Sequence, residues 1–274
     1  MPPTSRKAAR PISTGAETCL RRIRKSWDGC SDNDPSCTRK SRKKGGKAVP
    51  KRWITDTALT VVLLLLMGYS LIGETAHEWL GISMLALAVL HHKWNWAWCK
   101  SLGKGRISAY RAVQSILACL LLFSVLGSLL SGMVLSRYVL GFWTMRLGQD
   151  LAATAHLPCA FWSFLLTGLH LGLHWGSVKE TARRITGIRI VAGKWTVVLR
   201  LAGGIIACCG LTAFFRNAFL DYLMMKSHFL FVPPGQTAAG FLADYLAILS
   251  MFVWIGYYGG NILRGHSGRK KVIE

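Results

Sequence analysis

The segment HEWLGISMLALAVLH, residues 77–91, begins and ends with histidine and is mainly apolar between them. The segment HLPCAFWSFLLTGLH, residues 156–170, repeats this design, with its two histidines again 14 positions apart. In an α-helix, 14 residues advance about 21 Å and return to within about 40° of the starting face. Each segment therefore predicts a helix with two imidazoles on one side, one near each edge of a hydrocarbon layer about 30 Å thick.

The composition of the whole chain is typical of a membrane protein. Of its 274 residues, 51% are hydrophobic and only 17% are charged, and the mean hydropathy is +0.33. A soluble domain of this size carries more charge. The net charge of +22 would also suit nucleic-acid binding, but membrane proteins concentrate basic residues on their cytoplasmic side. We therefore expect membrane lipid, and not nucleic acid, around this chain.

Six apolar runs are long enough to cross a membrane, and each can satisfy its backbone in lipid only as a helix. The predicted fold class is therefore all-α integral membrane, with about six transmembrane helices. A further stretch, residues 217–235, has several large apolar side chains and is expected to lie on the outer surface. The six runs cover roughly residues 54–73, 78–98, 110–135, 151–175, 197–215 and 238–260.

The distribution of Lys and Arg predicts the orientation. With the amino terminus inside, the inner segments hold 30 of the 34 basic residues. This bias predicts a multi-pass protein of the inner (cytoplasmic) membrane with both termini cytoplasmic. We expect residues 1–52 to form a disordered basic cytoplasmic tail, 53–264 a transmembrane cytochrome b-like domain, and 265–274 a second cytoplasmic tail.

The same orientation makes the second and fourth helices parallel, which sorts the histidines into two pairs of equal depth. His77 and His156 lie at the outer end, and His91 and His170 lie toward the inner end. Two neutral imidazoles fill both axial positions of a haem iron, which then carries electrons and does not bind oxygen. A lone histidine near a helix end is more often an interfacial residue. Two depth-matched pairs favour ligation of two haem b irons in a four-helix bundle core.

The inner pair has alternatives. His92 follows His91 and faces about 100° away, so only one of them can face the bundle. His174 lies one turn after His170 on the same face. It is either the inner ligand in place of His170, or a hydrogen-bonding partner of a haem propionate or a quinone.

Other residues are expected to support these pairs. Glu74 and Glu78 flank His77 and would orient its imidazole, accept protons at the outer surface, or form a solvated acidic turn. Asp56, near the start of the first run, is interpreted as a helix cap. Small residues are expected to line the haem slot. The glycines placed for this are Gly68, Gly73, Gly81, Gly127, Gly132, Gly168 and Gly172.

Four short segments are similar to the flavinylation-associated membrane cytochromes. They are GETAHEWLG at 73–81, HHKWNW at 91–96, GLHLGLHW at 168–175 and DYLAI at 244–248, and the resemblance covers roughly residues 54–264. It implies a b-type cytochrome that passes electrons toward flavin-bearing proteins outside the cytoplasmic membrane. The two histidine pairs also resemble the four-helix core of respiratory cytochrome b. Because the chain has no dinucleotide fingerprint or flavin motif, the flavin would belong to a separate extracytoplasmic protein.

The leading hypothesis is therefore an electron-transfer cytochrome that relays electrons between a quinol or other membrane donor and an extracytoplasmic flavin-bearing redox protein. Such a chain would also serve as a quinol oxidoreductase subunit. One alternative is a haem-bearing membrane anchor of a dehydrogenase or reductase complex. Another, from a different class, is a histidine-containing metal or proton transporter. Transporters favour carboxylates within the spans and broken helices, whereas the spans here are nearly free of Asp and Glu.

Overall fold

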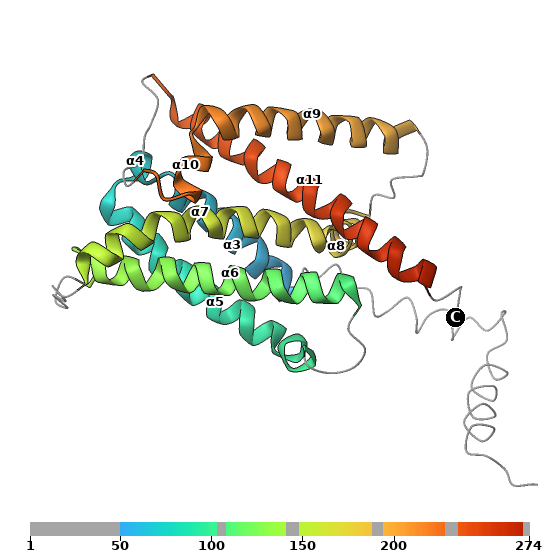
Figure 1. Ribbon diagram of the computed structural model, residues 1–274, viewed down its shortest axis with the longest axis horizontal. Coiled ribbons are helices and arrows are strands. Elements are labelled where there is room, and N and C mark those ends of the chain that lie inside the picture. The colour runs from blue at the N-terminus through green and yellow to red at the C-terminus, as the bar shows by residue number, and fades with distance from the viewer. Residues whose placement is uncertain (1–49, 103–107, 141–147, 188–193, 228–234, 271–274) are drawn as a thin grey trace, which may run out of the picture. The chain divides into compact units, whose positions relative to one another are not determined.

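The computed structural model describes residues 50–102, 108–140, 148–187, 194–227 and 235–270. For residues 194–196 and 266–270 the structure describes the backbone but not the side chains. Most of the predicted tail at 1–52, and the end of the predicted tail at 265–274, also lie outside the described residues. Within them, every regular element is a helix (Figure 1).

Six long helices follow the six apolar runs. Two of the runs are interrupted: α3 ends before Gly68, and α7 ends before His174. The short helix α4 (Tyr69–Ile72) completes the first run, and α8 (Trp175–Thr186) follows α7. The long helices are α3 (Lys51–Met67), α5 (Glu74–Ser101), α6 (Ala109–Leu135), α7 (Gln149–Leu173), α9 (Lys194–Arg216) and α11 (Ala238–Lys270).

Four of the long helices are long and apolar enough to cross a membrane: α6, α7, α11 over Ala238–Gly265 and α9 over Val197–Arg216. This supports an all-α, multi-pass membrane protein. By the same criteria of length, hydropathy and charge, α3 and α5 do not qualify as membrane-spanning helices. Helix α3 has only 17 residues, and α5 carries acidic and histidine residues near one end and histidine, lysine and asparagine near the other. Six spans therefore stay a prediction.

Helix α7 is the central helix of the described chain. It packs along α6 on one side and along α11 on the other, and α11 in turn packs along α9. Helix α5 packs chiefly along α3. Successive long helices run in alternating directions, so that α5 and α7 are parallel (Figure 1). Pairing of the histidines by depth requires α5 and α7 to be parallel in this way.

The short helix α10 (Phe219–Leu223) corrects one expectation. We expected residues 217–235 to lie on the outer surface, but Phe219, Tyr222 and Leu223 are buried in the core. The Tyr222 ring stacks on that of Phe161 in α7, with ring centres 4.3 Å apart. Aromatic burial of this kind stabilises the packed position more strongly than an interfacial one. Residues 228–234 of this stretch lie outside the described part.

Glycines of α7 and α11 let these two helices approach closely. A Cβ on Gly172 would lie 2.3 Å from the carbonyl oxygen of Val253, and one on Gly168 would lie 2.6 Å from the Phe252 Cβ. Both positions were expected to line a haem slot, and this interpretation is wrong because α11 fills the space. Small residues at helix contacts are the usual means of close packing in lipid.

We expect Gly256→Ala to destabilise the α7–α11 contact. The added Cβ would lie 2.5 Å from the Leu169 carbonyl oxygen, which is backbone and cannot rotate away. Overpacking of this kind lowers the free energy of unfolding by about 1–3 kcal/mol. Gly259→Ala on the same helix is the matched control, because its Cβ would meet no atom within 4 Å. Thermal unfolding in detergent measures both; equal midpoints would contradict the close contact.

Candidate functional site

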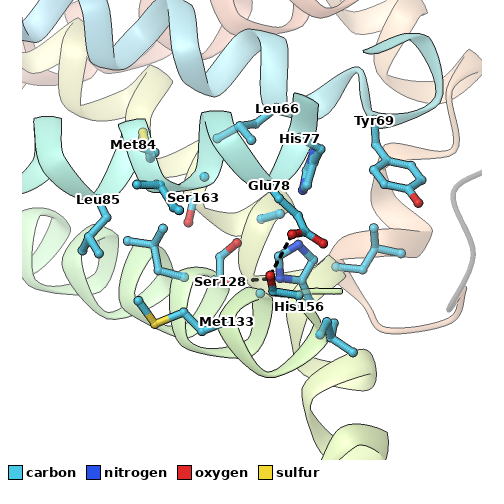
Figure 2. Close-up of a pocket in the computed structure, with 18 of the residues that line it drawn as sticks. Leu66, Tyr69, His77, Glu78, Met84, Leu85, Ser128, Met133, His156 and Ser163 are labelled. Atoms are coloured by element: carbon cyan, nitrogen blue, oxygen red, sulfur yellow. Dashed lines mark hydrogen bonds between the residues drawn. The ribbon is translucent and has the colours of Figure 1, made fainter. Parts of the chain in front are cut away.

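A cavity of about 500 Å³ lies between α3, α5, α6 and α7. Its walls are mainly apolar, with leucine and methionine side chains from α3 and α5 and small residues from α6 and α7. The volume falls in the range of cofactor and ligand pockets, about 300–1,000 Å³. His77 from α5 and His156 from α7 are among the lining residues (Figure 2).

The two imidazoles predicted as the outer pair lie opposite one another in this cavity. The ring centres of His77 and His156 are 6.1 Å apart, with an angle of 71° between the ring planes. An imidazole–metal–imidazole unit with bonds of about 2 Å places its ring centres roughly 6 Å apart. The ring spacing is therefore compatible with a metal ion that both imidazoles would ligate.

The neighbours of His156 fix which of its nitrogens is free. Its Nδ1 lies 3.0 Å from the carbonyl oxygen of Ser128 (Figure 2). It also lies 3.1 Å from the hydroxyl of Ser131. The Ser131 hydroxyl donates to the Gly127 carbonyl oxygen at 2.6 Å, so toward the imidazole it acts as an acceptor. With its proton on Nδ1, His156 keeps the lone pair of Nε2 for a ligand or metal.

His77 has the Leu66 backbone as a hydrogen-bonding neighbour. Its Nδ1 is buried and has no hydrogen-bond partner among the described residues. Its ring meets that of Tyr69 edge-on, with centres 5.2 Å apart. A buried polar atom without a partner is costly, and such atoms are concentrated at sites that a ligand or water completes.

Two of the seven expected glycines line the cavity. A Cβ on Gly81 would meet no atom within 4 Å, so this position leaves space inside the cavity. A Cβ on Gly132 would lie 3.1 Å from Cε1 of His156. The others have structural roles: Gly127 packs on Cys159, Gly73 forms a turn with φ +81°, and Gly68 separates α3 from α4.

The acidic residues beside His77 do not orient it, so that expectation is wrong. The Glu78 carboxylate accepts the Ser136 hydroxyl at 2.7 Å and three successive backbone N–H groups, beginning at Arg137, at 2.7–3.1 Å. Glu74 lies 3.7 Å from the Arg137 guanidinium. These carboxylates therefore fasten the segment after α6 to the start of α5. Nothing in the sequence indicates this contact, because 58 positions separate Glu78 from Ser136.

At the other end of α5, Asp56 contacts one of the inner histidines. The Nδ1 of His91 donates to Oδ1 of Asp56 at 2.7 Å. Asp56 is not a helix cap, because α3 begins at Lys51 with Pro50 in the capping position. Sequence reasoning missed this partner, which lies 35 positions from His91. The neighbouring His92 instead bonds the Ala88 carbonyl of its own helix at 2.8 Å.

The remaining inner histidines lie at the end of α7. The ring centres of His170 and His174 are 4.7 Å apart. Nδ1 of His170 is buried and has no partner among the described residues, whereas Nε2 of His174 lies 2.8 Å from the amide nitrogen of Gln114. His170 also lies within electrostatic reach of His174, His91 and Asp56. His91 of α5 therefore lies within electrostatic reach of both His170 and His174.

The described residues contain no cluster of three or more His, Cys, Asp or Glu side chains able to hold a bare metal ion. A haem iron needs only two protein ligands, so this finding does not test the haem prediction. Comparison of the chain with protein-family models, with curated proteins and with solved structures gave no match. Function is therefore inferred from the geometry of the two histidine groups and from the sequence motifs.

Proposed function

We propose that this protein is a b-type membrane cytochrome that holds two haems and relays electrons across the cytoplasmic membrane. The arrangement that supports this most is His77 opposite His156 in a mainly apolar cavity of about 500 Å³. The hydrogen bond from His156 Nδ1 to the Ser128 carbonyl oxygen leaves Nε2 available as a ligand. Bound haem, held by two histidines, would supply one-electron chemistry.

The protein's own groups would do three things at the outer site. His77 and His156 would hold the iron, and Ser128 would fix the tautomer and ring orientation of His156. The apolar walls would exclude water and so influence the redox potential. Gly81 would leave room for the flat macrocycle between the helices.

At the inner site we propose His91 and His170 as the ligands. The Asp56 carboxylate orients His91 from another helix, whereas His92 is bonded to its own. The amide of Gln114 donates toward Nε2 of His174, which occupies the lone pair that would bind iron there. The buried Nδ1 of His170 has no hydrogen-bond partner among the described residues, as expected of a ring whose contacts a ligand would complete. His174 would then support the inner site from one turn away.

The topology of the proposal includes α3 and α5 as two further spans, with both termini in the cytoplasm. The alternating helix directions and the basic residues of the inner segments support it. Electrons would pass between a quinol or other membrane donor and a separate flavin-bearing protein outside. A haem-bearing anchor subunit of a larger complex would use the same two sites.

One spectrum tests the proposal. The full chain, purified in detergent from cells supplied with haem, should show a sharp b-type α band in the dithionite-reduced minus oxidised spectrum. Its haem content should be close to two per chain, because each site takes two imidazoles. A folded, colourless preparation would overturn the cytochrome and favour the transporter alternative. One haem per chain would leave only one of the two sites.

A further inference from the structure

The histidines proposed as ligands differ in what their Nδ1 atoms touch. Nδ1 of His91 donates to a carboxylate oxygen of Asp56 at 2.7 Å. Nδ1 of His156 meets the neutral carbonyl oxygen of Ser128 at 3.0 Å. Those of His77 and His170 have no partner among the described residues. One of the two sites therefore has an anionic partner on an axial ligand, and the other has none.

A carboxylate bonded to Nδ1 of a ligating histidine changes the reduction potential of the iron in a known direction. The charge-assisted hydrogen bond draws the imidazole proton away and makes the other nitrogen a stronger donor. Ferric iron carries one more positive charge than ferrous iron, so both the stronger donor and the nearby negative charge favour the ferric state. A site with such a partner has a lower reduction potential than one without it.

Other charged groups of the described residues lie near the histidines, and none is seen to bond an imidazole. In the outer cavity, Glu74 lies 3.7 Å from the Arg137 guanidinium. Arg264 lies within electrostatic reach of His174, but its guanidinium bonds the Tyr110 hydroxyl at 2.6 Å and the Leu173 carbonyl at 3.0 Å. Glu78 lies within reach of His77, but its carboxylate is occupied by the donors of the segment after α6. The direct contact between Asp56 and His91 is therefore the main difference between the sites.

We infer that Asp56 is a positioning residue that selects His91 over His92 and keeps the inner haem at a lower potential than the outer haem. This inference rests on the proposed function. Its consequence is a direction: an electron that enters at the inner site moves downhill to the outer site. The relay would deliver electrons outward, to an acceptor beyond the membrane.

Redox titration of the haem-loaded full chain tests this inference. Asp56→Asn keeps the size of the side chain and removes its charge. Because the Asp56 side chain is 47% exposed, solvent screens part of its effect. We expect the ferric-to-ferrous equilibrium of the lower-potential haem to shift at least about threefold toward ferrous, about 28 mV at 59 mV per tenfold change for one electron. The higher-potential haem should keep its value.

Two variants serve as controls. Asp150→Asn makes the same change at an exposed position near the outer end of α7, and should shift neither potential. Asp56→Glu retains the charge and should keep the lower potential close to that of the unchanged protein. His91→Ala assigns the signals, because it should remove the lower-potential component.

The outcomes separate this inference from the proposed function. A protein with two haems whose potentials do not move in Asp56→Asn would overturn the inference and leave the cytochrome standing. Loss of the higher-potential component in His91→Ala would overturn the proposed direction. Absence of any b-type band from the unchanged protein would overturn the proposed function, and the inference with it.

Discussion

In the proposed cytochrome, replacement of His77 or His156 with alanine should remove the outer haem and spare the inner one. Each iron would need both imidazoles, and the His77 and His156 rings, with centres 6.1 Å apart, line one cavity. Haem content should fall from about two to about one per chain, and about half of the α-band absorbance should be lost. The reduced minus oxidised spectrum and a haem assay of the purified variants measure this change.

Thr75→Ala is a suitable control for the outer site. Thr75 lies in the same turn of α5 as His77 but is exposed, so the variant should keep both haems. Two results would contradict the pairing of His77 with His156. One is a well-folded His77→Ala protein that keeps both haems. The other is loss of the outer haem in His77→Ala combined with loss of the inner haem in His156→Ala.

At the inner site, His91→Ala and His170→Ala should each remove one haem, whereas His92→Ala and His174→Ala should keep two. His92 bonds a carbonyl of its own helix and has no carboxylate partner like Asp56, and Nε2 of His174 meets the Gln114 amide, so we expect His91 and His170 to be the ligands. His174→Ala should still alter the inner site, because its ring centre lies only 4.7 Å from that of His170. We expect a shifted α band without loss of haem.

The four variants also provide each other's controls, since all exchange histidine for alanine at the inner ends of α5 and α7. Haem loss in His174→Ala but not in His170→Ala would reassign the ligand on α7. Haem loss in His92→Ala but not in His91→Ala would do the same for α5, and would remove the basis of the role inferred for Asp56.

The outer pair was predictable from sequence because its signals are periodic and local. The spacing of 14 positions places two histidines on one face of a helix. The basic residues of the connecting segments make the two helices parallel. Helix boundaries followed the apolar runs within a few residues in most cases, because backbone that crosses lipid satisfies its hydrogen bonds as a helix.

The partners of the histidines were not predictable in this way. Asp56 and His91 lie on different helices, and Asp56 near the start of an apolar run is equally well explained as a cap. Glu78 bonds backbone groups of a distant segment, and backbone groups leave no mark in the sequence. The burial of Phe219 depends on the position of three other aromatic-bearing helices. Such contacts depend on tertiary packing, which periodicity does not encode.

Helix α5 packs much more on α3 than on α6, and this has a consequence for biosynthesis. Helix α5 rests chiefly on α3, and the cavity with His77 and His156 lies between this helical hairpin and the α6–α7 pair. In the proposed cytochrome, the bound cofactor would supply much of the adhesion between these two halves. Cells short of haem should therefore accumulate a chain whose first hairpin is inserted but undocked. Quality-control proteases of the membrane would degrade that chain before the haem-loaded one.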